Sequence, residues 1–348
     1  MLSVYRNMFR IRDLRNKILF TLFIFAAYRL GAAVPVPGVD PAAVKEYADA
    51  AEQSGIVGLL NLFSGGALEV FSVFSLGIMP YITSSIIMQL LAVVIPRLQR
   101  LQEEGEAGRK VVTQWTRYLT VILALLQSTG ITFLLSRPNT VLTGATPLIT
   151  EYTPGRVLIM VLTMTAGTAF IMWLGELITQ RGVGNGMSLI NFVSIVSQIP
   201  AQFASIEANS SALQVWVIRG MFLLLTAGII FVDQGQRRIP IQFSKRVRGR
   251  RVLGGQSTYI PMKVNNAGVI PIIFASSVLY FPALIASSIP TEGFFGPIRR
   301  FVDANLVSGT SWWYVIFFGM LIIFFTYFYT AIQFDPARQS DMIQRQGG

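Results

Sequence analysis

The chain has 348 residues, of which 53% are hydrophobic and 13% are charged, and its formal net charge is +11. Soluble domains carry about 25% charged residues, and a water-soluble fold of this length could not hide so much apolar surface. The composition excludes disorder and favours lipid as the solvent. The chain has no Cys and no His, which removes disulfides, thiol nucleophiles, haem ligation, nearly all zinc chemistry and the commonest general base. We expect no catalytic residue, no metal site and no cofactor.

The first apolar segment runs into Pro35-Val-Pro-Gly38. No small-x-small cleavage site precedes this turn, so we expect the segment to stay in the mature protein as a membrane span.

Eight segments are long and apolar enough to cross a membrane, which takes about 20 apolar residues in a helix. Most of them are bounded by Pro, Gly or charge. They predict an all-α, polytopic transmembrane helix bundle. The predicted spans are 18–34, 74–95, 115–135, 156–178, 187–203, 213–232, 267–289 and 311–332.

The basic residues predict the orientation of the bundle. Five stretches on one face hold 21 of the 28 Lys and Arg residues, namely 1–17, 96–117, 176–186, 233–263 and 333–348. The positive-inside rule makes this face, with both termini, cytoplasmic. Arg29 and Arg219 lie near span ends, where long cationic side chains can reach the lipid headgroups.

The apolar run 56–74 lies on the predicted outer side and is too short to cross the membrane. Gly65-Gly66 interrupts it. Either it forms an interfacial helix, or it folds back from outside into the bundle, where irregular backbone is tolerated when protein buries it. Its length and composition alone favour the interfacial helix.

Polar side chains recur inside the second, third and seventh predicted spans, among them Thr83, Gln127 and Asn265. They indicate either ordinary hydrogen bonds between helices, worth under about 1 kcal/mol each, or a shared interface or path through the bundle. The spacing alone favours the first interpretation.

The predicted cytoplasmic loop 234–263 contains no acidic residue. Three explanations of its positive charge remain open. The charge can set the membrane orientation of the chain, or it can attract anionic lipid, at about 1 kcal/mol of binding free energy per basic residue. It can also form a docking site for a phosphate backbone or an acidic protein face. The basic residues are Arg237, Arg238, Lys245, Arg246, Arg248, Arg250, Arg251 and Lys263.

The chain has no G-x-x-x-x-G-K-[ST] motif, so we expect no nucleotide site of that kind. The glycines of 182–186 follow a predicted span rather than a strand. They predict a tight cytoplasmic turn.

Several motifs, in their order and spacing, resemble the SecY family, the central subunit of the bacterial protein-conducting channel. They are Pro35-Val-Pro-Gly-Val-Asp40, Phe63-Ser-Gly-Gly-Ala-Leu68, Leu76-Gly-Ile-Met-Pro-Tyr-Ile-Thr-Ser-Ser-Ile-Ile-Met-Gln-Leu-Leu91, Glu104-Gly-Glu-Ala-Gly-Arg109, Arg181-Gly-Val-Gly-Asn-Gly186 and Gly255-Gln-Ser-Thr-Tyr-Ile-Pro-Met-Lys-Val-Asn-Asn-Ala-Gly-Val-Ile-Pro271.

The resemblance implies an N-terminal half, 1–203, with five spans and a plug segment at 56–68. A partial C-terminal half, 204–348, has spans six to eight and the basic loop. The family has ten spans, so we expect the ninth and tenth to be missing from a chain that ends at Gly348.

The resemblance also implies residue roles. It places Ile78, Ile82, Met187, Asn191, Ile270 and Ile273 in an apolar pore ring. It places Leu59, Leu60, Leu62, Phe63, Gly65 and Gly66 in the plug, and Thr83, Gln127 and Asn265 at a lateral gate. Met187 and Asn191 depart from the aliphatic residues usual at the fifth-span positions.

The implied function is a channel, not an enzyme, that passes secretory polypeptides across the bacterial plasma membrane and releases apolar segments sideways into lipid. The implied partners are the SecE and SecG membrane subunits, and the SecA ATPase or a translating ribosome on the basic loop. Nascent polypeptide and anionic lipid complete the set. The alternative is a secondary transporter of a small solute.

Overall fold

The structure is a computed structural model of the whole chain. It describes residues 11–39, 61–135, 153–241, 246–248, 251–253, 258–288, 296–307, 311–333, 340 and 344. Leu59, Leu60, Lys245 and Arg250 lie outside the described residues, and the side chains of Arg246, Arg248 and Arg251 are likewise outside the description.

The chain forms two compact units. The first contains residues 1–203 and 276–318, and the second contains 204–275 and 319–348. The division after Phe203 coincides with the predicted boundary between the halves. Residues 276–318, however, group with the first unit rather than with the rest of the predicted C-terminal half.

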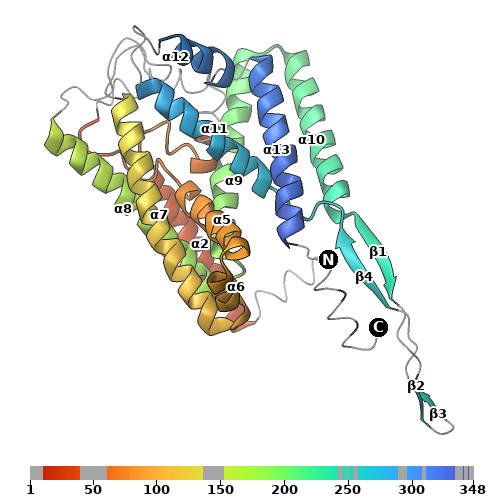
Figure 1. Ribbon diagram of the computed structural model, residues 1–348. Helices are drawn as coiled ribbons and strands as arrows, with labels where there is room; N and C mark the ends of the chain where they lie inside the picture. Colours follow the sequence, from red (N-terminus) through yellow and green to blue (C-terminus); the bar gives the residue numbers. More distant parts are fainter. Residues whose placement is uncertain are drawn as a thin grey trace. The chain divides into compact units, whose positions relative to one another are not determined.

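The described residues of the first unit are mainly helical. Up to Phe203 the helices are, in chain order, α2 (Arg12–Ala32), α5 (Met79–Val94), α6 (Pro96–Glu103), α7 (Glu106–Leu135), α8 (Pro154–Arg181) and α9 (Gly186–Asn209), the last as far as Phe203. Helix α7 packs against α5, α6 and α8, and α2 packs against α8 (Figure 1). Each coincides with a predicted span except α6, which turns back along α7.

The second predicted span is shorter in the structure than in the sequence analysis, because its first five residues form turns and helix α5 starts only at Met79. At Ile95 the backbone becomes extended, with ψ 109°, as a residue before proline prefers. Helix α6 then leaves at an angle of 110° to α5.

The tight turn predicted at 182–186 is confirmed. The side chain of Asn185 caps α9, since its Oδ1 accepts hydrogen bonds from the backbone N–H of Met187 at 3.1 Å and of Ser188 at 3.3 Å. Such a cap satisfies donors that the first helical turn leaves unpaired.

The second unit contains α10 (Ala212–Gln234), which coincides with a predicted span, and four strands, which were not predicted from the sequence. The strands are β1 (Gln236–Ile241), β2 (Arg246–Arg248), β3 (Arg251–Leu253) and β4 (Thr258–Lys263). Strand β1 pairs antiparallel with β4, and β2 with β3. Figure 1 shows the β1–β4 ladder following the end of α10, with β2 and β3 beyond it.

The remaining elements are α11 (Ile270–Ser288), α12 (Gly296–Val302), a π-helical turn (Asp303–Val307) and α13 (Trp312–Gln333). Within the described residues, four helices are long and apolar enough to span a membrane, namely α8, α9, α10 and α13, and the bent pair α5–α6 can be a fifth. Most large side chains of α10 are exposed and apolar, for example Leu224 and Phe231, which indicates a surface for lipid rather than water.

Candidate functional site

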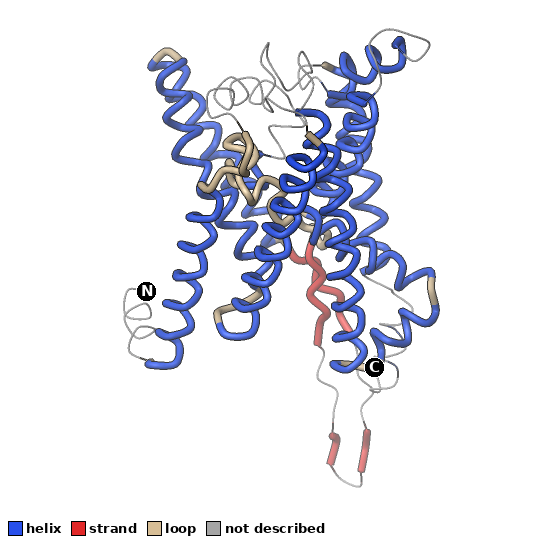
Figure 2. Tube along the Cα trace, turned by 90° about the vertical axis from the view of Figure 1, so that its left-hand side faces the viewer, coloured by secondary structure: helices blue, strands red, loops and turns tan. Residues whose placement is uncertain are grey.

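The stretch from Asn61 to Ile78 is an irregular segment buried inside the first unit. One helical turn, residues 61–64, leads into a series of turns that ends where α5 begins, drawn as tan tube among the helices in Figure 2. Phe63, Ala67, Leu68 and Phe71 are each no more than 3% exposed. The interfacial helix favoured from the sequence is therefore wrong for residues 61–74, and the chain folds back into the bundle.

The segment satisfies its own backbone groups with polar side chains. The Asn61 amide accepts a hydrogen bond from the Glu69 N–H at 3.1 Å and donates one to the Glu69 carboxylate at 2.9 Å. The hydroxyl of Ser64 accepts from the Leu68 N–H at 3.1 Å, and the hydroxyl of Ser75 donates to the carbonyls of Ala67 and Ser72. Irregular backbone needs such partners once it is removed from water.

Two neighbouring elements hold the segment. On one side it pairs with residues 34–36, which follow α2: the Val36 N–H donates to the Phe71 carbonyl at 3.0 Å and the Val73 N–H to the Val34 carbonyl at 2.9 Å. On the other side it touches α9, where a Cβ at Gly65 would lie 3.0 Å from Ser194 Cα and one at Gly66 would overlap the Gln198 amide. Both glycines have positive φ, so this close approach requires glycine.

Three of the predicted pore-ring residues share one apolar cluster. Ile78 is 2% exposed and is part of the core of the first unit, and Ile82 and Met187 pack against that core. Asn191, one turn along α9 from Met187, has a buried amide oxygen with no hydrogen-bond partner among the residues that the structure describes. Leaving a buried polar atom unpaired costs about 1–3 kcal/mol.

Side chains of helices α5, α7 and α11 meet within the first unit along a seam. The hydroxyls of Thr83 on α5 and Ser277 on α11 are 3.5 Å apart, long for a hydrogen bond. Beside them lies a cavity of about 20 Å³, room for about one water molecule. It is lined by Leu68, Ser75, Leu76, Met79, Gln127, Ile131 and Ser277.

The other predicted ring and gate residues belong to the second unit. Ile273 is 4% exposed and Ile270 begins α11. Asn265 precedes the helix, and its side-chain oxygen accepts a hydrogen bond from the Gly268 N–H at 3.1 Å, which is a local turn contact. That these three residues lie in one site with Ile78, Ile82 and Thr83 stays a prediction.

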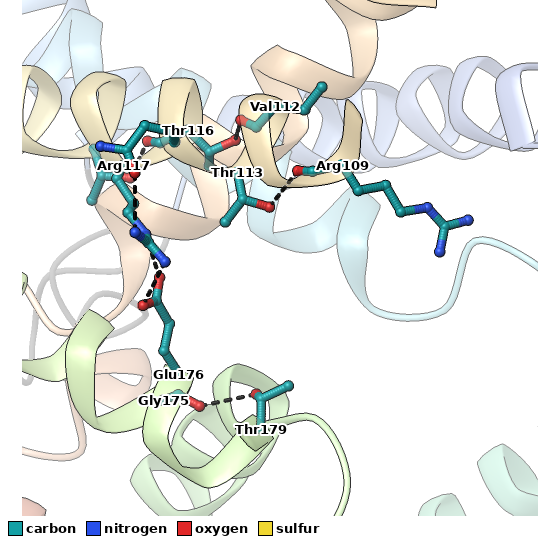
Figure 3. Close-up of polar contacts among 10 residues, drawn as sticks. Arg109, Val112, Thr113, Thr116, Arg117, Gly175, Glu176 and Thr179 are labelled. Carbon is teal, nitrogen blue, oxygen red and sulfur yellow. Dashed lines mark hydrogen bonds and ion pairs between the residues drawn. The ribbon is translucent and has the colours of Figure 1, made fainter. Parts of the chain in front are cut away.

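An ion pair joins α7 to α8. Arg117 binds both carboxylate oxygens of Glu176, through Nε at 2.7 Å and Nη2 at 2.8 Å (Figure 3). Its Nη1 donates to the Gln114 side chain at 3.0 Å. The paired geometry is the strongest that an arginine and a carboxylate adopt. It links α7 to α8, and neither residue was among the predicted site residues.

The β1–β4 ladder carries two of the predicted docking residues. Arg237 and Arg238 follow each other on β1, so their side chains point to opposite faces, and both are exposed. The guanidinium of Arg238 lies 4.9 Å from the ring centre of Tyr259 on β4, a distance at which a cation and an aromatic face attract each other. The ladder thus presents charge outward on a paired, regular backbone.

The SecY family profile matches residues 72–348. The chain is 46% identical over 352 residues to a protein of Corynebacterium glutamicum, and 48% identical over 356 residues to one of Mycobacterium tuberculosis. Both are named protein translocase subunit SecY, and each alignment covers 100% of this chain and 80% of the relative. The chain belongs to the SecY family.

A solved structure supports the fold of this SecY-family chain. Sec61 in the canine ribosome–channel complex from the endoplasmic reticulum has a TM-score of 0.56 and 15% identity, over 94% of this chain and 75% of that one. The predicted all-α, SecY-like membrane fold is confirmed. The predicted function class, a protein translocase channel subunit, is also confirmed, and the small-solute transporter finds no support among these relatives.

Sequence reasoning missed the contacts that position the irregular segment. Tyr28 and Arg29 on α2, and Ser194 and Ser197 on α9, all bond to the segment or to each other. The only signal was Arg29 itself, an arginine inside an apolar span, which was assigned to the lipid headgroups. A cation in a span usually has a polar partner within the protein.

Proposed function

We propose that this chain lines a channel through which secretory polypeptides cross the bacterial plasma membrane. Its identity of 46–48% to proteins named protein translocase subunit SecY, along its whole length, is the observation that carries this function. The geometry adds a physical account of how such a channel stays closed to ions and how it sorts its substrates.

The constriction is a ring of apolar side chains that includes Ile78, Ile82 and Met187. A narrow apolar waist excludes water while it is empty, because water there would lose hydrogen bonds. Branched aliphatic side chains also yield to any passing sequence without binding it. From the family resemblance we assign Ile270 and Ile273 on α11 to the same ring. Asn191 makes this ring more polar on the α9 side than aliphatic residues would.

The segment around 56–68 is the plug, a second barrier on the outer side of the ring. Its part from Asn61 onward is buried and hydrogen-bonded, which supports a barrier with a defined resting position. Leu62, Phe63, Gly65 and Gly66 contribute to it, together with Leu59 and Leu60.

We assign the lateral gate to the α5–α7–α11 seam, with Thr83 on α5, Gln127 on α7 and Asn265 in the turn that precedes α11. The Thr83–Ser277 hydroxyl contact of 3.5 Å and the cavity lie along this seam. Through it, an apolar segment gains roughly 0.3–0.6 kcal/mol per Leu, Ile, Phe or Val, whereas one central Asp, Lys or Arg costs about 2.5–3.5 kcal/mol. The free-energy cost of one central charge therefore offsets the gain from several apolar residues.

Transport needs energy from a partner, because the sequence has no nucleotide-binding loop of the Walker type. We assign the basic ladder and loop, from Arg237 to Arg251, to docking of the SecA ATPase or a ribosome on the cytoplasmic face. Anionic lipid attracts the same residues. SecE and SecG brace the helices, and both termini of the chain are cytoplasmic.

The test is translocation in lipid vesicles that hold the chain with SecE and SecG. A labelled secretory protein, added with SecA and ATP, should become protected from protease, while the same vesicles without SecA serve as the control. Uptake of labelled sugars, amino acids and ions is measured in parallel. Protection of the secretory protein without solute uptake is the expected result, and solute uptake without protection would overturn the proposal.

A further inference from the structure

We propose that Tyr28 and Arg29 are positioning residues: they tie the 61–66 turn to α9 and so set how firmly the channel stays closed at rest. This inference rests on the proposed channel function. It concerns residues on α2 and α9 to which neither the motifs nor the ring, plug and gate roles assign a part.

Tyr28 makes a bridge between the turn and α9. Its side chain is 0% exposed, and its hydroxyl lies 3.1 Å from the Ser64 carbonyl and 2.6 Å from the Ser194 hydroxyl. Ser194 in turn lies 2.9 Å from the Ile190 carbonyl. One buried phenol thus links the α2 helix, the turn and the α9 helix.

The protons of this bridge are limited. Tyr28 and Ser194 have one hydroxyl proton each, for three contacts: to the Ser64 carbonyl, between the two hydroxyls and to the Ile190 carbonyl. Whichever two contacts are made at a given moment, loss of the phenol hydroxyl removes the side-chain donor that reaches Ser64. The bridge is a unit, since both hydroxyls share its protons.

Arg29 reinforces the bridge one residue further along α2. Its Nη1 donates to the Gly65 carbonyl at 2.8 Å and to the Ser197 hydroxyl at 3.1 Å. A charged donor makes these bonds stronger than neutral ones. Arg29 and Tyr28 therefore contact successive residues of the turn, Gly65 and Ser64, and the same face of α9.

The turn itself cannot shift by small steps. A Cβ at Gly66 would overlap Gln198, and one at Gly65 would meet Ser194, so the turn backbone already rests directly on α9. Packed contacts of this kind separate rather than deform gradually. Displacement of the turn must break the Tyr28 and Arg29 bonds together, and these bonds then add to the free energy that opening requires.

The experiment measures the potassium leak of resting vesicles that hold the chain with its SecE and SecG partners and no substrate. The variants are Tyr28→Phe, Ser194→Ala and both together. Tyr118→Phe and Ser188→Ala are matched controls, because both residues are exposed. Removal of one buried hydrogen bond should raise the open population, and hence the leak, roughly two- to ten-fold. The double variant should leak no more than the leakier single variant.

Thermal stability of every variant is measured beside the leak, and Arg29→Lys is a further variant that retains the charge. Should Tyr28→Phe fail to accumulate, Ser194→Ala alone carries the test. A resting leak equal to that of the unchanged chain, equal leaks in the controls, or full additivity in the double variant would overturn the inference. Protease protection of a secretory protein by the unchanged chain, measured in the same vesicles, separates failure of this inference from failure of the proposed function.

Discussion

The irregular segment 61–78 and the strand ladder 236–263 both connect helices, yet their backbones are satisfied in opposite ways. The first is buried, and its N–H and C=O groups depend on particular serines, an asparagine and glycines. The second is exposed and pairs strand to strand, as β1 does with β4. Backbone removed from water needs tailored partners, whereas an exposed ladder needs only its register. We therefore expect substitutions to be costly in the first region and nearly neutral for stability in the second.

The largest effect should come from Gly167 on α8, which rests directly on the irregular segment. An added Cβ would overlap the Val73 carbonyl and lie 2.8 Å from the Val73 side chain. Gly167→Ala should therefore destabilise the protein by about 1–3 kcal/mol, measured by thermal unfolding in detergent. Gly155→Ala on the same helix is the control, since nothing lies within 4 Å of its Cβ position. Equal unfolding temperatures for the two variants would contradict the packing described here.

A smaller effect is expected at the α7–α8 ion pair. Its side chains are 38% and 21% exposed, so solvent weakens the attraction, and Arg117→Gln should cost about 1 kcal/mol. The double exchange Arg117→Glu with Glu176→Arg should restore part of the loss. Asp13→Asn, which breaks the more exposed Asp13–Lys17 pair, should cost no more than a few tenths of a kcal/mol. Equal losses of unfolding free energy in Arg117→Gln and Asp13→Asn would contradict this account of the ion pair.

The smallest effect on stability should come from the ladder. Arg237→Glu combined with Arg238→Glu should change the free energy of unfolding by less than about 0.5 kcal/mol, because both side chains are exposed. The same variant should bind SecA or ribosomes more weakly, with a reduced dependence of binding on salt. Arg300→Glu on α12, which is also exposed, should leave the affinity unchanged. Unaltered binding by the double variant would remove the docking assignment.

The long helices could be predicted from the sequence, whereas the irregular segment and the strand ladder could not. The long apolar helices were found because lipid imposes one strong rule of length and hydropathy. For the segment 61–74, length and composition alone favoured an interfacial helix, because they carry no record of the side chains that bury it, such as Phe74 stacked on Tyr28 at 5.7 Å; the family resemblance implied a plug at 56–68 instead. The strands β1 and β4 were missed because Pro240 and Pro261 interrupt the usual pattern. Within the described residues the two strands form a two-stranded sheet, so each is an edge strand, where proline is tolerated.

The candidate site divides similarly. Ile78, Ile82 and Met187 lie together in one cluster, and Thr83 and Gln127 line the same seam through Ser277. Their identities came from the family resemblance, since apolar residues in a span have no distinguishing period. Tyr28, Ser194 and Arg117 were not found, because a partner far along the chain cannot be inferred from one sequence.

The most direct test of the account places a photo-reactive residue at one position and stalls a secretory polypeptide in the channel. Positions Ile82 and Ile273 represent the ring, and Leu224 on α10, which is 71% exposed, represents the apolar outer surface. The account predicts crosslinks from the stalled chain to Ile82 and Ile273 and few or none to Leu224. Crosslinks to Leu224 as strong as those to the two isoleucines would contradict a polypeptide path through the ring.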